Sequence, residues 1–414
     1  MPTATRAGSA VPQAKVRRKR LTLPRLIFNI FLVVAIILAI FYGGGGWYYS
    51  TQIYEDNFLP AEPTGTDYDV QVTGVGEGSV TLVGAESNGD VNGQGIRGVQ
   101  WPDGYGQVDQ IQAQQFIEGD EELQLEVVRA YEPTMGDLTS GLDVAMESYA
   151  FPSDPLTAFG IPYETITYRS DLGPMSSWYI RGNTPTWMIF VHDKEAPLRE
   201  SLRFLPVAFD RNYHILVINY RNDPGNPSDA SGLYQYGYTE WADLDAAAFH
   251  ARENGAENVV FVGYGMGGAV VTSFLTQSPL RNQAAAAILD SPVLDLEAAV
   301  DHQAANTSLP VPFIDFKVPS SLNTVAKWMT GIRYDISWDD YNWLDQSVKL
   351  PTPMLIFHGA EDAMVPLSTT RSLRFARPSL VTVVETPADY LLSWNMEPAV
   401  YEAEASVFLD EHVG

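Results

Sequence analysis

The sequence predicts an α/β protein whose main domain is a mostly parallel sheet with helices on both faces. Short apolar segments recur from about residue 150 onward, and helical patterns such as 239–255 and 398–412 separate them. A continuous apolar strand is typical of a sheet buried on both faces, and strand–helix alternation is typical of parallel strands. The predicted strands are 187–191, 215–219, 258–262, 285–289, 354–357 and 380–384.

A single transmembrane helix is predicted ahead of this domain. Residues 1–25 hold seven basic residues and no acidic one, and residues 26–46 hold no charged residue. An apolar helix of this length spans the roughly 30 Å hydrocarbon core of a bilayer. Because basic residues stay in the cytoplasm and aromatic residues such as Trp47 mark the interface, we expect a cytoplasmic tail, a single-pass cell-membrane anchor and an extracytoplasmic main domain. A cleaved signal peptide is the alternative, but the apolar run is long for one and no small-x-small cleavage site follows it.

Two segments of different composition lie between the anchor and the sheet. Residues 47–66 are polar and contain prolines, which predicts a stalk. Residues 67–149 alternate apolar and polar side chains and are broken by glycine and asparagine, which predicts a β-rich extension of short antiparallel strands. The main domain then covers 150–414. Its residues 295–350 separate two predicted strands, and a connection of that length needs structure of its own, so we expect a lid insert of small helices there.

Composition excludes several classes of function. The chain of 414 residues has no cysteine, so disulfides, thiolate catalysis and cysteine metal sites are absent. Outside the first 25 residues, 18 basic residues face 51 acidic ones, a net charge of −33 that repels nucleic acid. We expect no cofactor and no metal. The carboxylates of Asp193, Glu361 and Asp362 are candidates for a metal site, but acidic residues at strand ends more often cap or face solvent.

Several motifs together resemble the α/β-hydrolases, and most of all the membrane-anchored hydrolases of actinobacteria. Their order and spacing carry the resemblance, which covers nearly all of the chain outside its termini. The segments are 101–108, 150–164, 191–192, 218–228, 236–247, 263–268, 289–295, 358–366 and 393–402.

The resemblance implies a catalytic triad whose positions are degenerate here. In that family the nucleophile stands in G-x-S-x-G on a strained turn between a strand and a helix. The matching triad positions in this sequence are Gly265, Asp362 and Tyr390. Glycine has no side-chain oxygen to form an acyl-enzyme, and a phenol with a pKa of about 10 is a poor general base at neutral pH. Only the acid is retained.

The region of the oxyanion hole is also altered. The resemblance places it at His192, Asp193 and Met266, and a carboxylate at 193 opposes a developing oxyanion. At ~4 Å and an effective dielectric of about 20, two like charges repel by about 4 kcal/mol. Of the six histidines, only His192 is expected near the mouth of the site, and the ordinary reading of all six is as packing or surface residues. The residues expected to line a ligand pocket are His192, Asp193, Tyr264, Met266, Trp328 and Tyr390.

These observations favour a pseudoenzyme of α/β-hydrolase fold in the cell envelope. We expect a catalytically silent, ligand-binding or accessory scaffolding subunit, with the membrane, a protein partner or complex, and a lipid or acyl ligand as its partners. The alternative is an active esterase, lipase or acyltransferase that acts on envelope lipids or esters through a non-standard nucleophile or base.

Overall fold

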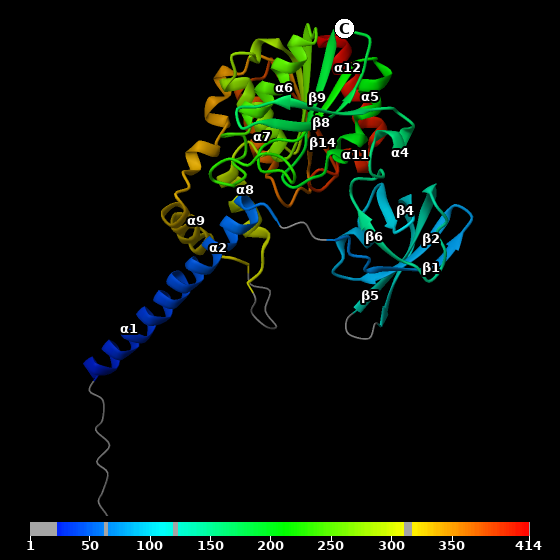
Figure 1. The fold of residues 1–414 in the computed structure, drawn as a ribbon. Coiled ribbons are helices and arrows are strands. Elements are labelled where there is room, and N and C mark those ends of the chain that lie inside the picture. Colours follow the sequence, from blue (N-terminus) through cyan, green and yellow to red (C-terminus); the bar gives the residue numbers. More distant parts are fainter. Residues whose placement is uncertain (1–22, 62–64, 119–122, 310–316, 414) are drawn as a thin grey trace, which may run out of the picture.

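The computed structural model describes residues 23–61, 65–118, 123–309 and 317–413, which form two sheets and a long N-terminal helix (Figure 1). The predicted basic tail, residues 1–25, lies outside the described residues except for its last three.

The main domain contains an eight-stranded sheet in the order β14-β13-β12-β11-β9-β10-β8-β7. The strands from β14 to β10 are parallel, and β8 is antiparallel to both of its neighbours. The six parallel strands confirm the six strands that the sequence predicts. Strands β7 and β8 are not among the predicted ones. The strands are β7 (Glu164–Arg169), β8 (Pro174–Ile180), β9 (Thr186–Val191), β10 (His214–Ile218), β11 (Asn258–Tyr264), β12 (Ala284–Asp290), β13 (Met354–Gly359) and β14 (Val381–Thr386).

Helices cover both faces of this sheet, because alternate side chains of its apolar strands point to opposite sides. Ile189 and Phe261 join a core with Phe274, whereas Phe190 and Val262 join a second core on the other face. The helices of the main domain outside the insert are α4 (Pro155–Phe159), α5 (Leu205–Asp210), α6 (Trp241–Glu253), α7 (Met266–Gln277), α10 (Leu367–Ala376), α11 (Ser393–Met396) and α12 (Pro398–His412), with 3-10 turns η2 (Leu198–Arg203) and η3 (Arg281–Gln283).

The predicted β-rich extension is a six-stranded closed barrel in the order β1-β2-β5-β4-β3-β6. All of its pairings are antiparallel, and closure leaves no exposed sheet edge. The barrel contacts the main domain through Asn395, whose amide donates to the carbonyls of Ile96 (2.6 Å) and Ser148 (2.8 Å). Its elements are β1 (Val70–Gly76), β2 (Ser79–Ala85), α3 (Gly89–Asn92), β3 (Arg97–Trp101), β4 (Gly104–Glu118), β5 (Leu123–Met135) and β6 (Asp143–Glu147).

The N-terminal segment is one unbroken helix from Leu23 to Phe58, 36 residues long. It consists of α1 (Leu23–Ala39), a π-helical turn η1 (Ile40–Gly44) and α2 (Gly45–Phe58). The apolar part of this helix, which is long enough to cross a membrane, is fully exposed.

The predicted stalk over 47–66 is wrong for its first part, because residues 47–58 are helical and packed. Ser50, Ile53 and Asn57 are buried, and Phe58 is completely enclosed. Their spacing places them on one face of a helix, so a sequence that is polar overall still docks through a narrow stripe.

The stripe packs against α9 (Ser320–Tyr334), which lies where α1 passes into α2 (Figure 1). A Cβ at Gly46 would lie only 2.8 Å from Val325 Cγ1, so glycine allows the close approach of the two helices. The Arg333 guanidinium lies 3.6 Å from the centre of the Trp47 ring and donates to the Trp47 carbonyl at 2.9 Å. The other elements of the insert are α8 (Leu296–Asn306), η4 (Trp338–Tyr341) and η5 (Leu344–Lys349), which confirms the prediction of small helices there.

Candidate functional site

The turn between β11 and α7 has the geometry that displays a nucleophile in many hydrolytic enzymes. Strand β11 ends at Tyr264, Gly265 has φ +48° and ψ −111°, and α7 begins at Met266. The Gly265 amide donates to the Asp290 carbonyl at 3.0 Å, which fixes the turn to the end of β12. A positive φ costs glycine little, so the turn is held without the strain that a side chain would add.

The carboxylate of Asp193, in the loop after β9, fills the space in front of this turn. Its Oδ1 accepts a hydrogen bond from the Met266 backbone N–H at 2.6 Å, and its Oδ2 accepts one from the Tyr390 hydroxyl at 2.8 Å. A Cβ built on Gly265 would overlap both the Tyr390 hydroxyl and the Asp193 carboxylate. The structure therefore brings Gly265, Asp193, Met266 and Tyr390 to one point.

In this arrangement, groups that acyl transfer needs are already engaged in hydrogen bonds. In a G-x-S-x-G turn, the N–H of the residue after the nucleophile is an oxyanion-hole donor, and here Met266 N–H already binds a carboxylate. Desolvation raises the pKa of Asp193, and the hydrogen bonds from Met266 and Tyr390 act in the opposite direction. Desolvation and the neighbouring Asp193 raise the pKa of Tyr390 well above its ordinary value. The phenol is thus a fixed donor and not a base.

Asp362 stands apart from this group. Its Oδ1 accepts from the backbone N–H groups of Met364 (2.9 Å) and Val365 (2.7 Å), in the turn after β13. Its Oδ2 is buried and has no hydrogen-bond partner within the described residues, and burial raises the pKa of this carboxyl to about 6. This oxygen lies 3.4 Å from His358 Nε2, and burial lowers the pKa of that imidazole to about 4. One oxygen of Asp362 is therefore bound by its own turn, and the other faces His358.

His192 is not available as a replacement base. Its Nε2 lies 3.0 Å from Asp223 Oδ2, its Nδ1 lies 2.6 Å from the Asp193 carbonyl, and its ring stacks on Tyr220. Burial alone would disfavour the charged ring, but Asp223 outweighs it and raises the pKa of His192 to about 9. Both ring nitrogens are engaged in a structural ion pair.

The cavity in front of the turn has a volume of about 470 Å³ and is lined by Asp193 and Tyr390 together with apolar residues such as Leu296, Ala299 and Val365. Four residues expected to line a pocket do not line this one. Met266 and Tyr264 are buried in the two cores, His192 is buried beside Asp223, and Trp328 is 63% exposed on α9. Tyr264 does not line the cavity because side chains alternate along a strand, which places its ring on the other face of the sheet beside Arg203.

A buried acidic group behind the site has no signal in the sequence. Glu200, from η2, accepts the Asp193 backbone N–H at 2.7 Å and pairs with Arg203 at 3.3 Å. Burial raises the pKa of Glu200 to about 7, and it does the same for Asp290 at the end of β12. Among the described residues, no cluster of three or more His, Asp or Glu side chains is placed to hold a metal ion.

The sheet order, the strand–turn–helix and the helical insert define a fold of the α/β-hydrolase type. The crystal structure of an esterase from Pyrococcus furiosus superposes with a TM-score of 0.50 at 15% identity, over 64% of this chain and 95% of that one. An esterase domain from Rhodothermus marinus (TM-score 0.42, 18% identity, 61% of this chain and 100% of that one) is also similar. So is an α/β-fold hydrolase from Bacillus anthracis (TM-score 0.42, 13% identity, 61% and 99%). No family model and no curated protein matches the sequence. At these identities the likeness establishes the fold alone.

The buried acids predict that stability falls as pH rises. Glu200 and Asp290 titrate near pH 7 in the folded protein and near pH 4 when unfolded, so the folded state binds more protons between these values. The free energy of unfolding therefore decreases from about pH 5 to 7, and loss of the His192 proton extends the decrease toward pH 9. Thermal unfolding followed by circular dichroism should give a lower midpoint at about pH 8 than at about pH 5.5. Asp290→Asn should reduce the difference, and a midpoint that rises with pH would contradict the assignment.

The packing at the turn predicts that Gly265→Ser is strongly destabilising. Its side chain meets a positive φ, the Asp193 carboxylate and the Tyr390 hydroxyl, so strain and overpacking together cost about 2–5 kcal/mol. In the background Asp193→Gly with Tyr390→Ala, only the backbone strain remains, about 1–3 kcal/mol. Denaturant unfolding of the four proteins forms a double-mutant cycle. An equal cost of Gly265→Ser in both backgrounds would show that the carboxylate and hydroxyl do not fill the nucleophile space.

Proposed function

We propose that this chain is a membrane-anchored, extracytoplasmic and catalytically silent protein of α/β-hydrolase fold. It binds a ligand or a protein partner in the cell envelope as an accessory subunit. The observation that carries the proposal is the Asp193 carboxylate, which takes up both the oxyanion-hole donor of Met266 and the space of a nucleophile at Gly265.

Catalysis is lost at each chemical step of such a site. Gly265 offers no nucleophile, Asp193 places negative charge where an oxyanion would develop, and Tyr390 holds its proton. Loss of the serine or histidine of a triad lowers turnover by on the order of 10⁶. The buried carboxylate of Asp362, at the position of the family acid, supports the descent of this site from a working triad.

The N-terminal helix supports an anchor rather than a leader peptide. Its exposed apolar part continues without a break into α2, which is packed on α9 and ends at the enclosed Phe58. Cleavage near the glycines 43–46 would remove part of the packing on α9, including the contact of Gly45 with Leu322. The basic residues ahead of the span favour a cytoplasmic N-terminus.

The silent site predicts that the full-length protein in mild detergent does not react with a fluorophosphonate probe and does not hydrolyse p-nitrophenyl esters. The triple variant Gly265→Ser, Asp193→Gly, Tyr390→His restores nucleophile, base and oxyanion donor, with Asp362 as the acid to orient the imidazole. It should gain weak activity, since a misplacement of ~1 Å costs about 10²-fold. Gly265→Ser with Tyr390→His, which keeps the Asp193 carboxylate, is the matched control and should stay inactive. Single-site labelling of the unmodified protein would refute the proposal.

The proposed topology predicts that protease added to intact spheroplasts digests the barrel and the main domain. A short membrane-protected fragment that contains α1 should remain. Complete protection, with digestion only after lysis, would place the domain in the cytoplasm.

A further inference from the structure

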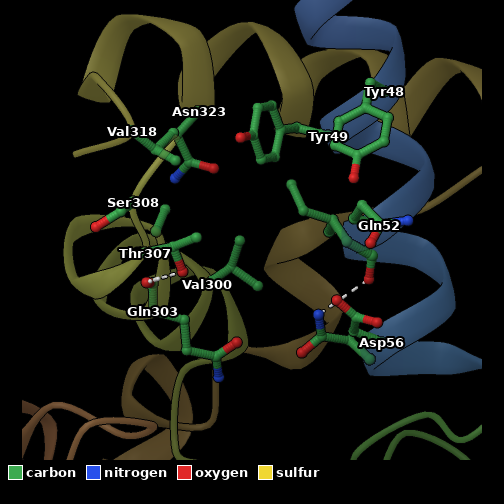
Figure 2. Close-up of a pocket in the computed structure, with 13 residues that line it drawn as sticks. Tyr48, Tyr49, Gln52, Asp56, Val300, Gln303, Thr307, Ser308, Val318 and Asn323 are labelled. Atoms are coloured by element: carbon green, nitrogen blue, oxygen red, sulfur yellow. Dashed lines mark hydrogen bonds between the residues drawn. The ribbon is translucent and has the colours of Figure 1, made fainter. Parts of the chain in front are cut away.

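A second cavity lies outside the former catalytic site, between α2 and the insert (Figure 2). Its volume is about 320 Å³, within the range of small-molecule pockets. Helix α2 forms one wall, and α8 and α9 form the other together with Thr307, Ser308 and Val318 (Figure 2). Apolar groups dominate its lining, which includes Tyr48, Tyr49, Ile53, Val300, Ala304 and Val318.

This outer cavity adjoins the inner cavity at Asp193 and Tyr390. Asp56, Asn57, Gln303 and Thr307 line both cavities. Asn57 donates to the Ile53 carbonyl at 2.9 Å, and Gln303 donates to the Met364 carbonyl at 3.2 Å. The half-buried Gln303 therefore belongs to the wall that the two cavities share.

The outer cavity lies beside the part of the N-terminal helix where the exposed apolar stretch ends. Tyr48 and Tyr49 line it, shortly after Gly45 and Gly46, which pack on α9. On the same pair of helices, Trp47, Trp328 and Ile332 are 58%, 63% and 65% exposed. Exposed tryptophan and apolar side chains at the end of a membrane span are typical of the bilayer interface.

We propose that the two cavities together hold one acyl chain of a membrane lipid, which enters from the bilayer between α2 and α8. The inference rests on the proposed function, because a silent site retains the lipid that an active hydrolase would cleave. Three observations converge on this occupant: the apolar lining, the continuity of the outer wall with the span through α2, and the inner end against apolar residues such as Leu296 and Ala299. A zwitterionic lipid fits best, since the acidic domain repels anionic headgroups.

The test uses full-length protein reconstituted into phosphatidylcholine vesicles that contain a phosphatidylcholine with a diazirine at the end of one acyl chain. After irradiation, peptide mass spectrometry should find adducts on inner-cavity residues such as Leu296, Ala299 and Val365, besides those on α1. Ala304→Trp fills the outer cavity and should abolish the inner adducts. The matched control is Ala305→Trp, at an exposed position that lines neither cavity, and it should retain them.

Several results would overturn the inference. Adducts confined to α1, or inner adducts unchanged by Ala304→Trp, would exclude entry through the outer cavity. Inner labelling by a free diazirine fatty acid in detergent, but not by the phospholipid in vesicles, would exclude a lipid from the bilayer. Release of the free acid from the phospholipid is measured in the same sample. Release would refute the silent site, whereas absent inner adducts on intact lipid would refute only the lipid inference.

Discussion

The structure of the site depends on one carboxylate held between two donors, the Met266 amide and the Tyr390 hydroxyl. Asp193 in this position ties the loop after β9 to the start of α7 and to the segment that follows β14. Behind it, Glu200 binds the Asp193 amide and Arg203, and Arg203 donates to the Leu391 carbonyl at 2.6 Å. Removal of the carboxylate would leave donors unpaired, which is costly at a partly enclosed position. The site is therefore stabilised in a closed arrangement by the Asp193 carboxylate and the groups that bind it.

The insert combines the role of a cover with that of a docking platform. Helix α8 lines both cavities, while α9 presses on the glycines of the N-terminal helix and fixes it through Arg333. Its outer helix, α9, is bound to the long N-terminal helix, so the position of the insert and that of the apolar segment are set together.

Much of the fold follows from local patterns, but the site does not. Continuous apolar runs identify the parallel strands, and Gly265 with its glycine neighbours identifies the turn, because these signals lie within a few residues. The docking of α2 and the closure of the barrel depend on partners far along the chain, such as Arg333 for Trp47. The alternating, partly polar strands β7 and β8 resemble loops by composition. The degenerate positions could be found by their spacing, but the direction of the Asp193 carboxylate could not, since it is fixed by Met266 and Tyr390.

The unbroken helix from Leu23 to Phe58 has a mechanical consequence. A protein tethered by a flexible linker samples many orientations, whereas a helix packed at one end behaves as a lever. For a chain anchored through α1, the tilt of the span sets the orientation of the whole domain relative to the bilayer. A thicker or thinner bilayer changes that tilt. The barrel, joined to the main domain through Asn395, then changes its orientation together with that domain.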